Sequence, residues 1–289
     1  MSEKVNAVLG YVHGYRWNDI SGFVQSLRRT GYSGEICLIC SAVAPDELEK
    51  FRAHGVRVEA SPYACRKFKN SWAKSWRVLR YFPPLVRRLA LPHLAQVTIL
   101  RFLLYEQHFL REGSRYRRVL LSDVRDVWFQ ADPFQVDLGA GVHAFSEAAG
   151  RTIESEEINL RWIRHAFNTD VQRWLGKEPI LCSGTIIASA DSLPGFLSHF
   201  RQCFYLARRI RSGGIDQGVF NYAVRTCREP HVTIHNNGEA TVLTMGIMPE
   251  SDIRCDAIGR VVRPDGTVIP VLHQFDRHPQ IAARLLAGC

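Results

Sequence analysis

Long hydrophobic runs are missing from this sequence of 289 residues. No stretch reaches the roughly 18 consecutive apolar residues that a membrane-spanning helix needs. Residues 1–6 also lack a basic leader followed by an apolar segment, so we expect no signal peptide. Both features favour a cytoplasmic protein. The hydrophobic content of 46% is enough for a sizeable core, as in an ordinary globular protein.

Acidic residues are missing from residues 61–105, although the whole chain holds 28 of them. The same stretch carries nine basic residues, which are Arg66, Lys67, Lys69, Lys74, Arg77, Arg80, Arg87, Arg88 and Arg101. This region alone can therefore account for the net charge of +9. A patch of this kind attracts anions, which could be phosphates, acidic glycans, anionic lipid or nucleic acid.

A second CxxC motif is missing as well. The one such pair, Cys37 and Cys40, lies in an apolar run that is typical of a buried strand. Side chains three positions apart on a strand point to opposite faces of the sheet, so the two thiols should diverge. We therefore expect no zinc site here, and we interpret the eight cysteines as reduced and structural.

The hydrophobic pattern of the first 60 residues predicts alternating strands and helices. It predicts strands at residues 5–11, 35–41 and 56–60, with helices at 20–30 and from Pro45 to about Gly55. Such a β-α-β-α-β start is typical of a mostly parallel sheet with helices on both faces. The fold class we predict is therefore α/β.

The rest of the chain continues this alternation and ends in a strand-rich part. We predict helices at residues 68–82, 93–110, 191–209 and 216–224, and strands at 116–121, 142–145, 181–188, 232–234 and 241–245. A hairpin should join residues 261–262 to 268–272 through Pro264, Asp265 and Gly266. No repeat, low-complexity tract or linker interrupts the chain, so we predict one domain over residues 1–289.

Two carboxylates, Asp123 and Asp126, follow the predicted strand at 116–121. Ligands of open α/β sheets bind beyond the carboxyl ends of strands, and Mg²⁺ or Mn²⁺ prefers oxygen ligands there. The spacing of three requires a turn that brings Asp126 round. The alternative is structural, with Asp123 capping the turn and Asp126 paired with Arg125 or another arginine.

Three later groups could carry chemistry. His273 ends a predicted strand and could bind a metal, or it could close a hairpin by hydrogen bonding. Ser183 and Gly184 form a small-residue turn that lets a ligand approach the backbone closely. The third group is Asp216, Gln217 and Asn221, in which Asp216 could instead be a helix N-cap.

Taken in order, these motifs resemble the GT-A family of nucleotide-sugar glycosyltransferases, which have a Rossmann-like N-terminal half and a DxD-type motif after a central strand. The matching stretch runs from Arg118 to Gln130 and contains Ser-Asp-Val-Arg-Asp-Val. The resemblance implies a nucleotide-binding half at residues 1–135 and a donor-sugar and acceptor half at 136–289. The usual motif spaces its acids two apart, whereas Arg125 takes that position here.

The resemblance also implies roles for individual residues. A divalent cation, Mn²⁺ or Mg²⁺, would be held against the donor diphosphate by Asp123, Asp126 and His273. Donor-binding positions would be Arg101, Ser122, Arg125, Ser183, Gly184 and Asn221. Asp216 and Gln217 would lie near the anomeric carbon, in a pairing that resembles the retaining branch. An inverting enzyme needs a carboxylate base, for which the sequence offers Asp216, Glu147, Glu156 and Glu157.

The expected activity is sugar transfer from a nucleoside-diphosphate sugar, with a UDP-sugar as the commonest donor, in bacterial-type surface polysaccharide synthesis. The acceptor would be a glycan or a lipid-linked glycan, and the basic residues 61–105 either contact the inner face of the membrane or form a solvated surface. Alternatives are a metal-dependent phosphohydrolase and a non-catalytic basic protein that binds nucleotide or nucleic acid. Zinc-finger, RNP-type and GxxG-type signatures are missing, so we expect no nucleic-acid partner.

Overall fold

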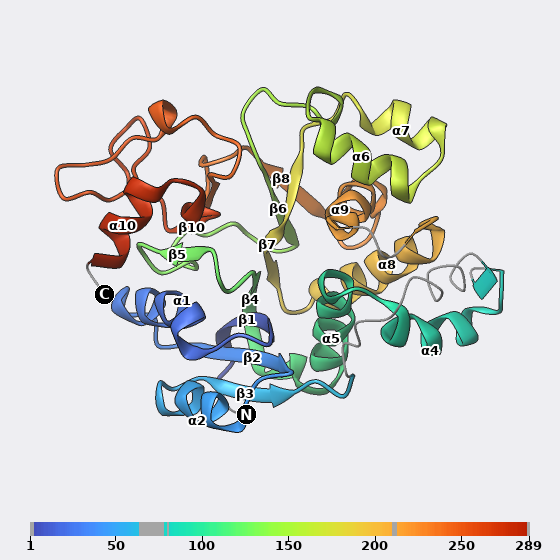
Figure 1. Cartoon of the computed structure of the whole chain (residues 1–289), viewed down its shortest axis with the longest axis horizontal. Coiled ribbons are helices and arrows are strands. Elements are labelled where there is room, and N and C mark those ends of the chain that lie inside the picture. The colour runs from blue at the N-terminus through green and yellow to red at the C-terminus, as the bar shows by residue number, and fades with distance from the viewer. Residues whose placement is uncertain (1–2, 64–77, 80, 210–212, 288–289) are drawn as a thin grey trace.

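A computed structural model describes residues 3–63, 78–79, 81–209 and 213–287 (Figure 1). Most of the predicted helix at 68–82 lies outside these residues. The same is true of six of the nine basic positions between 61 and 105.

A seven-stranded sheet in the order β3-β2-β1-β4-β7-β6-β8 forms the centre of the molecule. Neighbouring strands are parallel except at β7, which runs antiparallel to both β4 and β6. The bounds are β1 Val5–His13, β2 Glu35–Ser41, β3 Arg57–Ala60, β4 Tyr116–Ser122, β6 Val142–Ser146, β7 Leu181–Ser189 and β8 Val232–His235. The predicted α/β class and mostly parallel sheet are thereby confirmed.

Successive side chains of a strand point to opposite faces of the sheet, and helices cover both faces. On β1, Val8 packs with Phe23 and Phe51 of the helices on one face, whereas Leu9 packs with Phe102 and Phe200 on the other. The first face is covered by α1 Trp17–Arg29 and α2 Pro45–Ala53. The second is covered by α5 Val97–Glu112, α8 Leu193–Leu206 and α9 Ile215–Thr226.

Four further helices were not predicted as separate elements. They are α4 Pro84–Leu94, α6 Glu157–Ala166, α7 Thr169–Leu175 and α10 Pro279–Ala287. The predicted helix at 93–110 is wrong at its start, because extended backbone at Ala95 and Gln96 separates α4 from α5. Pro84 occupies the first turn of α4, where its missing N–H costs no hydrogen bond. Short 3₁₀ turns are η2 Gly113–Arg115, η3 Ile153–Ser155, η4 Glu250–Asp252 and η5 Phe275–Arg277.

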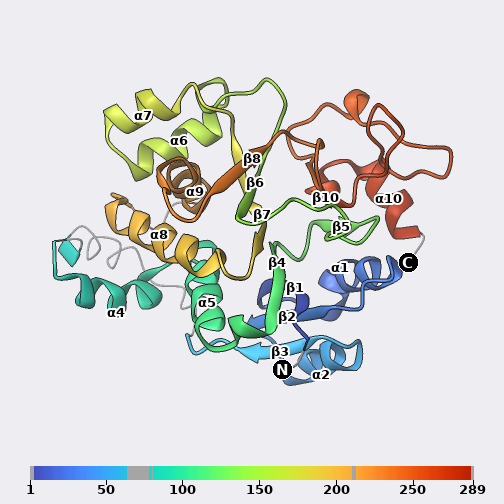
Figure 2. The ribbon, with the colours of Figure 1, turned by 180° about the vertical axis from the view of Figure 1, so that it is seen from behind.

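A second sheet of three short strands lies beside the first, between α1 and α10 (Figures 1 and 2). Its order is β5-β10-β9, with β5 Val127–Phe129, β9 Val242–Thr244 and β10 Val271–His273. The predicted hairpin exists as an antiparallel bridge between Val262 and Val268, but the regular strand begins three residues later.

The CxxC pair diverges as predicted. Cys37 belongs to the core on the α5 side of the sheet and Cys40 to the core on the α1 side. The described cysteines are free. Across the described residues, no helix combines the length and the apolar character that crossing a bilayer requires.

Candidate functional site

A cavity of about 340 Å³ lies at the carboxyl ends of β1 and β4, beside the first half of β7, which pairs antiparallel with β4. The first turns of α5 and α9 and the end of β10 close it from the sides. Nine of the predicted site residues line it, namely Arg101, Asp123, Arg125, Asp126, Ser183, Gly184, Asp216, Gln217 and His273. Positions from five separate elements therefore meet at the edge of the sheet where ligands of α/β proteins bind.

Asp123, Asp126 and His273 form a cluster whose ligand atoms lie within 4.8 Å of one another. Nε2 of His273 lies 3.5 Å from an Asp123 carboxylate oxygen and 4.0 Å from one of Asp126. This nitrogen is buried and has no hydrogen-bond partner among the described residues. A buried polar atom without a partner is costly, and a cation shared with the two carboxylates would satisfy it. The donor set fits Mn²⁺ or Mg²⁺.

The small sheet fixes the orientation of His273. As the last residue of the middle strand β10, it pairs with Val127 of β5 and Thr244 of β9. Its Nδ1 lies 3.4 Å from the sulfur of Cys182 and 3.5 Å from the Thr244 hydroxyl. The ring therefore turns its other nitrogen, Nε2, toward the carboxylates, as contacts to the opposite ring nitrogen commonly do for metal-binding histidines.

The groups around His273 raise its pKa. Burial alone would lower its pKa, because it disfavours the charged ring. Cys182, Asp126 and Glu147 together outweigh burial and raise the pKa of His273 to about 9. The groups around His273 therefore favour positive charge at this position.

Gly184 is the residue that leaves room for a ligand in this cluster. A Cβ at this position would lie 2.4 Å from the His273 ring, 2.6 Å from its Nε2 and 2.7 Å from an Asp123 oxygen. The pairing of β6 with β7 jumps from Ile186 to Cys182, so the three residues between them leave the regular ladder. Such irregularities re-aim backbone next to active sites. The predicted small-residue turn is thus an irregularity inside β7 that faces the cluster.

Asp126 reaches the cluster through the turn that its spacing requires. Residues 124–126 form a bend between β4 and β5. Val124 packs against Gly10 of β1. A Cβ on residue 10 would lie 2.2 Å from a methyl carbon of Val124, so this packing requires glycine. The backbone carbonyl of Asp126 accepts a hydrogen bond from the Gln274 N–H at 2.7 Å, which ties the bend to the end of β10.

Arg101 on α5 connects the two groups of acids. Its guanidinium forms ion pairs with Asp123 and, at 2.9 Å, with Asp216. It also donates to the carbonyl and the hydroxyl of Ser183 at 3.2 Å. The Ser183 hydroxyl in turn donates to Asp216 at 3.1 Å. The arginine therefore orients the carboxylate of Asp123 in this cluster and neutralises the buried Asp216.

Gln217 faces a second buried acid behind the cavity. Its amide donates to Glu147 at 2.9 Å and to the Asn159 side chain at 2.8 Å. Burial raises the pKa of Glu147, although His273 and Gln217 oppose the shift. Glu147 does not line the cavity itself. Its charge adds to the negative field around His273.

The remaining predicted residues lie at or beyond the rim. Arg125 lines the cavity with a half-exposed side chain that lies 3.5 Å from Asp276. Ser122 is buried, and its hydroxyl donates to the carbonyl of Asp123. Asn221 holds α9 to β7 by bonding both the N–H and the carbonyl of Leu181. Ser122 and Asn221 therefore support the cavity wall from behind.

Sequence reasoning missed several lining residues, which are Tyr11, His13, Tyr15, Trp162 and Gln274. Tyr11 and His13 lie in the last three residues of β1 and Tyr15 follows that strand, so strand order alone could have identified them. His13 and Tyr11 both contact the Ser41 hydroxyl at the end of β2, at 2.8 and 2.7 Å. Trp162 comes from α6, which the sequence pattern did not reveal.

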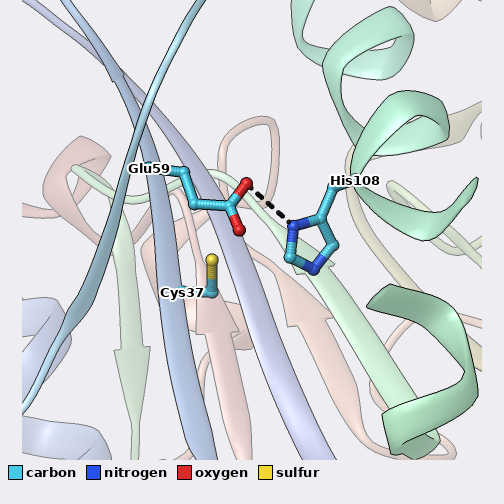
Figure 3. Close-up of side chains that lie close together, drawn as sticks. All are labelled: Cys37, Glu59 and His108. Carbon is cyan, nitrogen blue, oxygen red and sulfur yellow. Dashed lines mark hydrogen bonds and ion pairs between the residues drawn. The ribbon is translucent and has the colours of Figure 1, made fainter. Parts of the chain in front are cut away.

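A second group of metal-type side chains, Cys37, Glu59 and His108, lies under α5 and is shown in Figure 3. Here Glu59 already accepts hydrogen bonds or ion pairs from His108, Arg111 and Arg57. The other nitrogen of His108 bonds the Tyr116 hydroxyl at 2.9 Å. Hydrogen bonding to His108 lowers the pKa of Glu59, and burial raises that of Cys37. This group is a satisfied charge network rather than a cation site.

Comparison of the chain with protein-family models and with curated proteins finds no match. The functional conclusion therefore depends on the geometry of the cavity.

Proposed function

We propose that this protein is a metal-dependent glycosyltransferase of the GT-A type, which moves a sugar from a nucleoside-diphosphate sugar to a glycan or lipid-linked acceptor. The observation that carries the proposal is the convergence of Asp123, Asp126 and His273, in which the buried Nε2 of His273 faces both carboxylates and has no hydrogen-bond partner among the described residues. This occurs at the sheet edge where nucleotides bind in α/β proteins.

The charged groups that line the cavity support a reaction in which a nucleoside diphosphate is the leaving group. A divalent ion held by the three residues would neutralise part of the charge that develops on the diphosphate. Arg125 at the rim has a half-exposed guanidinium that can contact the same phosphates. Arg101 keeps Asp123 oriented, so the ligand set is preorganised before the donor binds.

The surroundings of Asp216 support transfer with retention. One of its oxygens already accepts from Arg101 and from the Ser183 hydroxyl. The carboxylate is also buried, so the oxygen that these donors occupy is poorly placed to take a proton from an acceptor hydroxyl. We therefore assign Asp216 and Gln217 to binding and orienting the donor sugar rather than to deprotonating the acceptor.

Isothermal titration of the protein with UDP and with GDP, with and without Mn²⁺, tests this proposal. We expect one nucleotide to bind at least about tenfold more tightly when Mn²⁺ is present, as for an ion that bridges protein and phosphate. Asp123→Ala and His273→Ala should abolish the dependence on metal. The matched control is His108→Gln, in the second group of metal-type side chains, which should leave it unchanged.

Two outcomes would overturn the proposal. Nucleotide binding that is independent of metal in the wild-type protein would remove the role of the cluster. Metal-dependent release of inorganic phosphate from phosphomonoesters, without cleavage of any nucleoside-diphosphate sugar, would instead identify a phosphohydrolase.

A further inference from the structure

Helix α4 and the residues just before it expose an unusual amount of apolar surface. Six large hydrophobic side chains between positions 78 and 89 are exposed, and we call them the α4 apolar face: Val78, Tyr81, Phe82, Leu85, Val86 and Leu89. Leu85 and Leu89 are 67% and 65% exposed. Single exposed apolar residues are ordinary, but a contiguous group marks an interaction site.

Leu85 and Leu89 are one helical turn apart and therefore lie on the same side of α4. Val78, Tyr81 and Phe82 precede Pro84, the first residue of the helix, and extend the exposed apolar surface at its N-terminal end. The opposite side of α4 anchors it to the protein through Leu91 and Leu94, which belong to the main core. The helix therefore carries apolar residues on two sides: the inner side packs on the core, and the outer side is exposed.

Charge identifies the kind of partner. The stretch 61–105, which contains α4, has nine basic residues and no acidic one. Arg88 is exposed beside the α4 apolar face, and Arg87 lies with its guanidinium 4.9 Å from the ring centre of Tyr205 on α8. Exposed leucines and aromatics next to arginines are the composition of helices that lie in the interface of an anionic bilayer.

A second cavity, of about 590 Å³, borders this face. It is lined by Leu85, Arg87 and Arg88 from α4 and by Tyr205 and Leu206 from the end of α8. Nε of Arg87 is buried and has no hydrogen-bond partner among the described residues. A recess that combines arginines with apolar walls suits the phosphate and upper chain of an anionic lipid.

We propose that the α4 apolar face docks on a lipid bilayer that contains anionic phospholipid. The position of α4 supports this, since it lies at the edge of the molecule opposite α10 in both views (Figures 1 and 2). The chain passes from α4 through two residues into α5, whose first residues, Val97 and Thr98, line the metal-site cavity. Docking would thus hold that cavity close to the membrane surface, whatever reaction it carries out.

Co-sedimentation with vesicles of phosphatidylcholine, with or without phosphatidylglycerol, tests the proposal. We expect binding only when phosphatidylglycerol is present, with weakening at high salt. The double change Leu85→Ser with Leu89→Ser should reduce the partition coefficient at least about tenfold, because two apolar contacts are lost. Arg88→Glu should reduce it about tenfold, since it replaces an attracted charge with a repelled one.

Matched controls use exposed residues of the C-terminal part. Ile258→Ser with Leu286→Ser removes two exposed apolar side chains, and Arg284→Glu reverses one charge on α10. Both should bind vesicles within about twofold of wild type. Equal loss in the test and control variants would overturn the proposal, as would binding to neutral vesicles alone. A concentration-dependent dimer that the leucine changes dissociate, without vesicle binding, would assign the face to a second copy of the chain instead.

Discussion

At the scale of single residues, Gly184 gives the sharpest test of the proposed metal site. Gly184→Ala would place a methyl group 2.6 Å from Nε2 of His273 and 2.7 Å from an Asp123 oxygen, which is the space that an ion needs. We expect Mn²⁺ affinity to fall at least about tenfold in a titration followed by electron paramagnetic resonance.

The control for this variant is Gly213→Ala, because no atom lies within 4 Å of a Cβ at that position. It should bind Mn²⁺ as wild type does. Equal affinity in Gly184→Ala and wild type would mean that the ion, if bound, lies elsewhere.

The protonation of His273 should make metal binding at the proposed site depend on pH. A histidine binds a metal ion only through a deprotonated ring nitrogen, so a proton must leave His273 when the ion binds. Because the pKa of His273 is raised from 6.5 to about 9, this competition extends up to about pH 9. Mn²⁺ affinity should rise about tenfold per pH unit from pH 7 to pH 8.5 and level off above pH 9. His273→Gln should bind more weakly and with a flatter profile, whereas a flat wild-type profile would contradict the assignment.

The residue types of the site could be predicted from sequence, but their geometry could not. Asp123 and Asp126 were ambiguous because a spacing of three does not say which way the chain turns. The turn depends on Gly10, more than 100 positions earlier, and on Gln274, almost 150 positions later. Long-range contacts of this kind leave no local pattern in the sequence.

At the scale of elements, Arg101 ties α5 to β4, β7 and α9. Its partner Asp216 is almost fully buried, so Arg101→Met would leave an uncompensated charge. We expect the free energy of unfolding to fall by about 3 kcal/mol in urea denaturation. In an Asp216→Asn background the same change should cost at least about 1 kcal/mol less.

The control for the Arg101 series is Arg164→Met, which removes an exposed ion pair with Glu157. This change should cost less than about 1 kcal/mol. Identical costs for Arg101→Met in both backgrounds would show that the ion pair with Asp216 contributes nothing.

A variant of Asn221 can distinguish a structural role of this residue from contact with the donor. It is buried, and its side chain bonds the N–H and the carbonyl of Leu181 and the carbonyl of Gln217. Asn221→Ala leaves these groups unsatisfied and should lower the free energy of unfolding by about 2 kcal/mol. Mn²⁺-dependent nucleotide affinity, measured by calorimetry, should stay within about threefold of wild type. Unchanged stability with lost nucleotide binding would assign Asn221 to the donor site.

Elements with a strong pattern were predicted well, and the others were missed for identifiable reasons. The buried strands β1, β2 and β4 appear in the sequence as apolar runs. By contrast, β5 has three residues and is defined only by its pairing with β10. Helix α4 was missed because its prolines at 84 and 92 are typical of loops, although the first occupies a position that tolerates proline.

At the scale of the whole molecule, the order of strands in the sheet determines which loops meet. Adjacent β1 and β4 run parallel, so the loops after them open onto one edge, and the antiparallel β7 brings Ser183 and Gly184 to the same edge. The sequence predicted the parallel start but gave no sign that β7 would reverse. The small sheet, which delivers His273, is likewise assembled from three distant segments.

The central claim, that Asp123, Asp126 and His273 together hold one divalent ion, is tested most directly by a Mn²⁺ titration monitored by electron paramagnetic resonance. We predict one bound Mn²⁺ per chain in the wild-type protein. Asp123→Asn and His273→Gln should each weaken binding at least about tenfold, and His108→Gln should leave it unchanged. A wild-type protein that binds no Mn²⁺, or that loses its Mn²⁺ on changing His108 rather than His273, would contradict the account.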